Sequence, residues 1–358
     1  MPPIAITRRA AAAGLGATLP RLAFAAEPPI TIGFSTVTQM TMSAYYNSIP
    51  MTLYWPGEKV EYRTIAMAGA NPAAEALATG HIDMAMLTNS ALFAMLDKYP
   101  DIGAVAVYTF TTGFNAMPAV KADSKLREIK DLQGKKVGLL SLGNSQLQVT
   151  RALMSLAGGD PNSIQFVAVG EGPEAAYALK NDRVDAIAIF DAVYAAIESL
   201  GVPLRELEGG KVDLEAIGFV SSVVVTRKYM EKNRDILVRT LRGMAKATVF
   251  AKANPEAAVR IHWKAFPETR PRGVPEDEAL RRGVAQLSAR LKNVREVDGL
   301  IGNSSVKQIQ TYQDLLLAGG VIKRVLPPEK LWDPGLIRDI NDFDRDAIRG
   351  QAANWTAP

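Results

Sequence analysis

"ALATGHIDMAML", residues 76–87, is the stretch of sequence that decides the fold. Its Ala- and Leu-rich start predicts the end of a helix that Gly80 terminates, and the apolar run that follows predicts a buried strand. The stretch "ALKNDRVDAIAI", residues 178–189, aligns with it without a gap and places Asp185 opposite Asp83. Two copies of one helix–turn–strand unit predict two lobes of similar fold. The alternative is a chance likeness between two such units.

Strands and helices alternate around each copy. The first series begins with the predicted strand "PITIGFS" at residues 29–35 and ends with the predicted strand "IGAVAVYTF" at residues 102–110. The second begins with the strand "KKVGLL" at residues 135–140 and ends with the helix "DAVYAAIESLG" at residues 191–201. Residues 215–226 then predict a strand that returns to the first series. This order is typical of a layered α/β fold.

The segments outside these series have the apolar spacing of helices that pack on a core. A helix is predicted over residues 40–55, directly after the first strand. One long amphipathic helix is predicted over residues 228–253, and a polar helix over residues 338–350.

Composition excludes several classes of function. The 358-residue chain has no Cys, two His and a formal net charge of +4, of which residues 1–26 carry +3 through three Arg. A nearly neutral remainder lacks the basic footprint of a nucleic-acid-binding protein. The absence of Cys excludes thiolate nucleophiles, and two isolated histidines form neither a metal site nor a triad. We therefore expect no nucleic-acid partner, no metal, no cofactor and no enzymatic activity. His81 is predicted as an exposed turn residue and His262 as a surface or packing residue.

Residues 1–26 have the layout of a cleavable signal peptide. A basic start at residues 7–9 precedes an Ala-, Gly- and Leu-rich run at residues 10–19, and residues 23–25 read Ala-Phe-Ala. The run is too short to span a bilayer. The start resembles a twin-arginine signal, but small residues at positions 11–12 leave twin-arginine and general export both open. A disordered or simply helical N-terminus is the alternative.

The loop "SLGNSQ", residues 141–146, lies between a predicted strand and a predicted helix, where phosphate loops and nucleophiles occur. It lacks the Lys of a Walker A loop, the glycine pattern of a dinucleotide loop and the first glycine of a nucleophile elbow. The free N–H groups of a helix N-terminus still favour an anionic or carbonyl oxygen. Ser141, Asn144 and Ser145 therefore either bind a ligand or only cap the helix.

Polar residues follow the strands in both series. Ligands of open α/β sheets bind beyond the carboxyl ends of the strands, so we predict that these residues face a cleft between the lobes. The candidate ligand-binding residues are Ser35, Thr36, Thr38, Gly69, Asn71, Thr88, Asn89, Ser90, Ser141, Asn144, Ser145, Gly172 and Asp191. Aromatic candidates, each of which could equally belong to the core, are Tyr45, Tyr46, Phe190 and Tyr194. For Asp83 and Asp185 we prefer a repeated turn, in which the carboxylate accepts backbone N–H groups, over an acid pair.

Two further stretches carry a family resemblance: "ADSKLREIKDLQGKKVGLLSLGNSQLQVTRALMSLAG", residues 122–158, and "SVKQIQTYQDLLLAGGVIKRVLPPEKLWD", residues 305–333. With the signal peptide and the repeated units, the chain resembles a periplasmic solute-binding protein of an ABC importer. The nearest branch is the NMT1/THI5-like group, which includes nitrate, sulfonate, taurine and thiamine-precursor binders. The resemblance covers roughly residues 29–335. It adds Gln39 and Gln146 to the candidate ligand-binding residues.

The resemblance implies a periplasmic binding protein type II fold, in which two similar α/β lobes close on a ligand about a hinge. Lobe 1 is expected to comprise residues 29–115 and 222–335, and lobe 2 residues 116–221. Residues 336–358 are expected to form a C-terminal helix and tail.

The implied function is capture of a small polar organic molecule in the periplasm and its delivery to a membrane permease, by a monomer. The alternatives are a pyrimidine-precursor synthase-like enzyme, which the absence of Cys disfavours, and a ligand sensor for a signalling partner. The strand-end loops contain no Arg or Lys, which disfavours nitrate and sulfonate. Asp191 and Glu171 instead permit a ligand with N–H donors, such as an aminopyrimidine.

Overall fold

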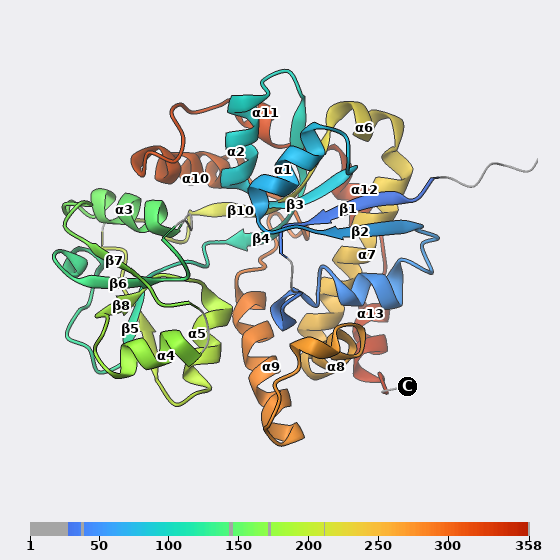
Figure 1. The fold of residues 1–358 in the computed structure, drawn as a ribbon. Coiled ribbons are helices and arrows are strands. Elements are labelled where there is room, and N and C mark those ends of the chain that lie inside the picture. The colour runs from blue at the N-terminus through green and yellow to red at the C-terminus, as the bar shows by residue number, and fades with distance from the viewer. Residues whose placement is uncertain (1–27, 37–38, 143–145, 171–172, 211, 357–358) are drawn as a thin grey trace, which may run out of the picture.

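The computed structural model describes residues 28–36, 39–142, 146–170, 173–210 and 212–356. The predicted signal peptide therefore lies outside the described residues. Two five-stranded sheets, each flanked by helices, make up the chain (Figure 1). Helices α3, α4 and α5 surround the second sheet, and α9 lies between that half and the half built on the first sheet. The predicted α/β class is confirmed.

The first sheet has the strand order β2-β1-β3-β10-β4. Strand β1 is parallel to β2 and to β3, whereas β10 is antiparallel to β3 and β4. The strands are β1 (Ile30–Phe34), β2 (Tyr62–Ala66), β3 (Met84–Thr88), β4 (Ala104–Gly113) and β10 (Gly218–Thr226).

The second sheet repeats this plan with the order β7-β6-β8-β5-β9. Strand β6 is parallel to β7 and β8, and β5 is antiparallel to β8. The strands are β5 (Ala119–Lys121), β6 (Lys136–Leu139), β7 (Gln165–Ala168), β8 (Ala186–Ile187) and β9 (Leu204–Glu206). The chain enters this sheet after β4 and returns to the first at β10. The exact lobe boundaries stay a prediction.

The repeated unit is confirmed in atomic detail. Asp83 accepts a hydrogen bond from the backbone N–H of Thr31 at 2.8 Å, and Asp185 accepts one from Lys136 at 2.8 Å. Each Asp also donates its own N–H to the carbonyl of the same partner, at 2.9 and 2.8 Å. The two carboxylates therefore close equivalent turns in separate sheets, and they do not form an acid pair.

The helices follow the predicted alternation. They are α1 (Ala70–Ala78), α2 (Asn89–Lys98), α3 (Gln146–Leu156), α4 (Pro173–Lys180), α5 (Asp191–Glu198), α6 (Arg227–Lys232), α7 (Arg234–Ala253), α8 (Pro255–Ala265), α9 (Glu276–Lys292), α10 (Val306–Ala318), α11 (Pro328–Leu331), α12 (Ile337–Ile340) and α13 (Arg345–Ala353). Short helical turns are η1 (Thr41–Ser43), η2 (Pro50–Tyr54), η3 (Ile129–Leu132), η4 (Pro267–Thr269) and η5 (Pro334–Leu336).

Three predicted helices are interrupted. The helix predicted over residues 40–55 is two short pieces, η1 and η2, and Pro50 occupies the first position of η2, where its missing N–H is tolerated. Ile49 and Trp55 there donate to carbonyls five residues back. The helix predicted over residues 228–253 breaks at Asn233, which has non-helical backbone angles of −127° and 31°. The predicted tail helix is divided into α12 and α13.

The return strand β10 is irregular where it re-enters the first sheet. Its pairing with β4 shifts register between Gly218 and Ser221. Phe219 lies there in the left-handed region, with φ of 57°, although its side chain is fully buried. Asn89 donates to the Phe219 carbonyl at 2.7 Å and to the Ser222 hydroxyl at 2.9 Å. Asn89 thereby stabilises a backbone conformation that a non-glycine residue rarely adopts.

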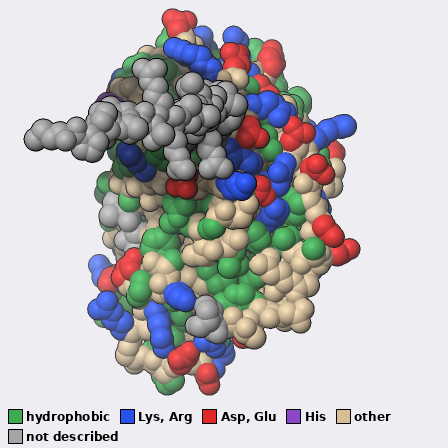
Figure 2. Space-filling view, turned by 90° about the vertical axis from the view of Figure 1, so that its right-hand side faces the viewer, with side chains coloured by type: hydrophobic (Ala, Val, Ile, Leu, Met, Phe, Trp, Pro, Cys, Tyr) green, Lys and Arg blue, Asp and Glu red, His purple; other side chains and the backbone are tan. Residues whose placement is uncertain are grey.

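The surface of the protein mixes charges of both signs. On the face in Figure 2, Lys and Arg side chains are interspersed with Asp and Glu and do not gather in one basic patch. Within the described part of the chain, no helix combines the length and the apolar character that a membrane crossing requires.

Candidate functional site

A cavity of about 180 Å³ lies between the two halves of the chain, at the carboxyl ends of strands of the first sheet. The residues after β1 and β3 supply one wall, and the start of α3 and the residue before α5 supply the opposite wall. Helices α9 and α10 each add one side chain. The polar lining residues are Ser35, Thr36, Thr88, Ser90, Asn115, Gln146, Ser221 and Arg290. The site thus lies where open α/β sheets bind their ligands.

Five of the sequence-predicted residues line this cavity: Ser35, Thr36, Thr88, Ser90 and Gln146. The hydroxyls of Thr88 and Ser90 lie 3.1 Å apart and form a small polar cluster at the end of β3. Strand-end position was therefore an informative signal, because parallel strands run in one direction and their carboxyl ends lie at the same edge of the sheet.

The other described candidates have different places. Gln39 is buried and donates to the Thr36 carbonyl at 3.2 Å, so it positions the loop after β1. Asn89 hydrogen-bonds to two residues of β10 through its side-chain amide. Gly69 precedes α1 with φ of 122°, and Asn71 and Ser141 are exposed. None of these five is among the described residues that line the cavity. Four further candidates lie outside the described residues: Thr38, Asn144, Ser145 and Gly172.

Asp191 is engaged by a residue that the sequence reasoning missed. Arg290 on α9 donates to Asp191 at the start of α5 in a two-pronged arrangement: Nη2 to Oδ1 at 2.7 Å, and Nε to both oxygens at 3.0 Å. Asn293 adds a hydrogen bond to Asp191 Oδ2 at 2.9 Å. Both side chains of the ion pair are only 6% exposed. The carboxylate lies behind the guanidinium and is not part of the cavity lining.

Arg290 keeps its charge in this setting. Burial by itself lowers the pKa of Arg290, but attraction and hydrogen bonds from Asp191 outweigh it and hold the pKa above its ordinary value. The expectation that the site offers no Arg or Lys was based on the strand-end loops alone. Nothing in the sequence pattern distinguishes Arg290 from the other cations of α9, because its partner lies 99 residues away.

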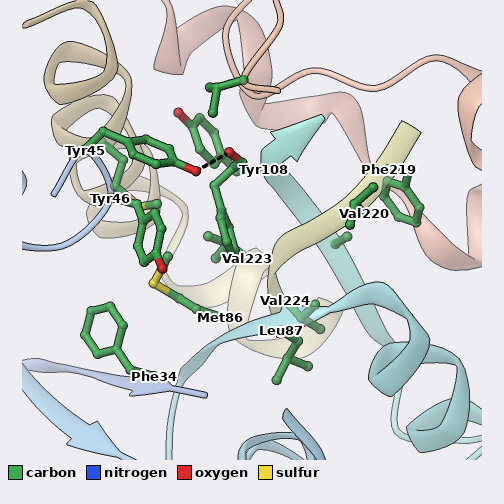
Figure 3. Packing of buried hydrophobic residues seen from close by; sticks show 14 of the residues in the cluster. Phe34, Tyr45, Tyr46, Met86, Leu87, Tyr108, Phe219, Val220, Val223 and Val224 are labelled. Carbon is green, nitrogen blue, oxygen red and sulfur yellow. Dashed lines mark hydrogen bonds between the residues drawn. The ribbon is translucent and has the colours of Figure 1, made fainter. Parts of the chain in front are cut away.

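Aromatic side chains form half of the apolar lining: Phe34, Tyr46, Phe110, Phe114, Phe190 and Tyr312. Tyr46 packs on Phe110 with ring centroids 4.8 Å apart, and the Arg290 guanidinium lies 5.7 Å from the Phe190 centroid. Tyr46 reaches toward Met86 beside Phe34 (Figure 3). Two of the four aromatic candidates, Tyr46 and Phe190, therefore line the cavity.

The other two aromatic candidates belong to the core. Tyr45 donates its hydroxyl to the Phe110 carbonyl at 2.8 Å, and Tyr194 donates to the Met117 carbonyl at 2.7 Å. Both side chains are buried, and burial raises the pKa of both hydroxyls. They stabilise the walls of the site from behind.

His262 on α8 is fully buried and supports the loop after β1 from the other side. Its Nε2 lies 2.9 Å from the Gln39 carbonyl, and its Nδ1 lies 3.0 Å from the Ser48 hydroxyl. A carbonyl only accepts, so Nε2 carries the hydrogen and Nδ1 accepts from Ser48. Burial lowers the pKa of His262 to about 4, which keeps the ring neutral. His262 is thus a packing residue, one of the two predicted alternatives.

His81 is exposed and hydrogen-bonds the Thr79 hydroxyl at 2.7 Å, as expected of a turn residue. Among the described residues, no group of three or more His, Asp or Glu side chains is arranged to hold a metal ion.

A family model described as NMT1/THI5 like matches residues 54–258. No curated protein sequence matches the chain. Among solved structures, a putative periplasmic sulfonate-binding protein from Methylobacillus flagellatus superposes with a TM-score of 0.62 and 20% identity, over 87% of this chain and 93% of that one. The aliphatic sulphonate-binding protein of Escherichia coli gives a TM-score of 0.60 and 20% identity, over 86% and 92%.

The desulfurization enzyme DszB also superposes, with a TM-score of 0.56 and 11% identity, over 87% of this chain and 98% of that one. At such low identities these likenesses concern the fold. The fold is shared by binding proteins and by at least one enzyme, so function has to be argued from the site.

Proposed function

Because the chain belongs to the NMT1/THI5-like family, whose model matches more than half of its length, we propose that it is the substrate-binding component of an ABC importer. In this role it holds one small polar organic molecule between its two lobes and delivers it to a membrane permease. The predicted signal peptide at residues 1–26 supports a place outside the cytoplasm.

The observation that carries the proposal is the cavity between the two halves. Its hydroxyls at the ends of β1 and β3 face Gln146 and Phe190 of the other half, so a ligand there touches both. Binding proteins close about a hinge when a ligand bridges their lobes. Arg290 also supplies the cavity with a guanidinium hydrogen-bond donor, which the strand-end loops lack and which suits a ligand with an acceptor group.

Thermal-shift screening of a metabolite library with the full chain tests the proposal. We expect at least one small polar compound to raise Tm in a concentration-dependent manner, as binding to the folded state requires. Mass spectrometry should recover that compound unchanged after prolonged incubation. Conversion of the compound to a product would favour an enzyme on the same fold, and a library without any binder would contradict a binding role.

Delivery to a permease is tested in cells. Deletion of the gene should abolish uptake of the radiolabelled ligand, and re-expression of the full chain should restore it. A sensor would instead leave uptake intact and change a signalling response to the same ligand.

A further inference from the structure

Arg290 is the single charged side chain among the described residues that line the cavity. Such a residue would ordinarily favour an anionic ligand, because a guanidinium matches carboxylate and sulfonate oxygens. Its actual effect depends on how much of its charge the protein has already balanced.

Asp191 carries the charge that balances Arg290. Its two oxygens accept from Nε and Nη2 of Arg290, and Asn293 supports one of them. Nη1 donates no hydrogen bond to any described residue. The cavity therefore receives free N–H donors from Arg290 without a net positive charge.

The aromatic part of the lining favours a flat ring in the ligand, beside the polar residues already named. Six aromatic side chains contribute to the walls, and the volume of about 180 Å³ is slightly larger than the roughly 150 Å³ of an apolar cavity that holds one benzene ring. Aromatic rings pack on one another in stacked or edge-to-face arrangements with added stability. One substituted aromatic ring fits this space.

We propose that Asp191 sets the charge of the ligand: by neutralising Arg290, it makes the cavity select an uncharged aromatic compound with an acceptor oxygen over the anion of the same shape. This inference rests on the proposed binding function and names its ligand class. The acceptor oxygen takes the free hydrogens of Arg290, and the ring packs among residues such as Tyr46 and Phe190.

The electrostatic reason is the short distance between the two partners. An anion that reaches Arg290 also approaches the Asp191 carboxylate, which lies within 3.0 Å of Nε and Nη2 of the same guanidinium. Repulsion then offsets most of the attraction, while the anion still loses its hydration. A neutral acceptor loses far less hydration and keeps the hydrogen bond.

Benzamide and benzoate test the proposal, because they share one ring and one shape and differ in charge at neutral pH. We expect the full-length wild-type protein to bind benzamide at least tenfold more tightly than benzoate in calorimetric or NMR titrations. Asp191→Asn should reverse the preference, because it leaves the Arg290 charge unbalanced. Glu198→Gln is the matched control: it removes one negative charge from the exposed end of the same helix, and the wild-type preference should persist.

The wild-type comparison stands even if Asp191→Asn fails to fold. Tighter binding of benzoate than of benzamide by the wild type would overturn the proposal, as would failure of both probes while the metabolite screen yields a non-aromatic ligand. In both outcomes the binding function would survive. Only a screen without any ligand would remove the binding function itself.

Discussion

Arg290 near the end of α9 and Asp191 at the start of α5 form a buried ion pair, with Nη2 2.7 Å from Oδ1. Helix α9 packs against α8 and η1 beside the first sheet, whereas α5 packs against α4 and β9 of the second sheet. The pair therefore joins the two halves directly behind the cavity. The attraction between the two charges is largely offset by the cost of desolvating them. Replacing both residues by apolar ones should therefore have a different effect from removing only one of them.

Disruption of the pair should be costly. Arg290→Ala leaves Asp191 buried and unpaired, and we expect the free energy of unfolding in urea to fall by about 3–5 kcal/mol. The double variant Arg290→Met with Asp191→Leu should lose less, because no charge remains buried. Arg295→Ala is the control: its ion pair with Glu215 is largely exposed, and we expect a loss below about 1 kcal/mol. A double variant less stable than Arg290→Ala would contradict this account.

His262 should make stability depend on pH. Burial lowers the pKa of His262 in the folded state to about 4, below its value of about 6.5 in the unfolded state. Between these two pH values the unfolded state binds a proton and the folded state does not. The stabilisation is complete above about pH 6.5 and is lost as pH falls toward 4. Between pH 7.5 and pH 4.5 it should contribute about 2–3 kcal/mol to the fall in unfolding free energy.

The two histidines of the chain provide their own control for this prediction. His262→Gln should lose that share of the pH dependence, whereas His81→Gln, at an exposed turn, should retain it. Urea titrations of the three proteins at both pH values measure the difference. Equal pH dependence in all three would show that other groups cause it.

The repeated Asp turns allow a comparison within one molecule. Asp83→Ala and Asp185→Ala each remove the acceptor of one strand N–H, and each should lower the free energy of unfolding by about 1–2 kcal/mol. Asp83 is the more buried of the two, so Asp83→Ala should lower the free energy of unfolding more than Asp185→Ala does. Chemical denaturation of both single variants checks the order. No loss in either variant would mean that water replaces the carboxylate.

These turns also explain why so much of the fold could be predicted. Residues 76–87 and 178–189 each contain every part of the repeated unit, since the end of a helix, the Asp of the turn and a strand follow one another along the chain. The unit can therefore be recognised without knowledge of distant contacts. Strands β5 and β9 were missed because each has three residues, too few for a visible alternation. The break at Asn233 was missed because Asn can also occur within helices, and only tertiary packing decides.

The site was predictable to the extent that it follows strand ends. Ser35, Thr88 and Gln146 line the cavity because they lie at or just after the end of a strand, or at the start of a helix. Arg290 could not be found in this way, because it lies on one face of a charged helix and acts through a partner distant in sequence. Adjacent polar residues such as Asn89 and Ser90 have the same local signal and yet point to different surroundings.

Asn89 and Ser90 allow a direct comparison between a residue that stabilises the fold and a neighbour that lines the cavity. Asn89→Ala removes the donor to the Phe219 carbonyl and the Ser222 hydroxyl, which are buried, so the free energy of unfolding should fall by about 2 kcal/mol or more. The affinity of the folded protein for the ligand from the metabolite screen should stay nearly unchanged. Ser90→Ala, at the cavity wall, should do the reverse: a loss of stability below about 1 kcal/mol and a several-fold weaker Kd. Parallel urea unfolding and calorimetric titration measure both quantities. If Asn89→Ala weakens binding and leaves stability intact, Asn89 contacts the ligand and the cavity extends further along β3 than its present lining indicates.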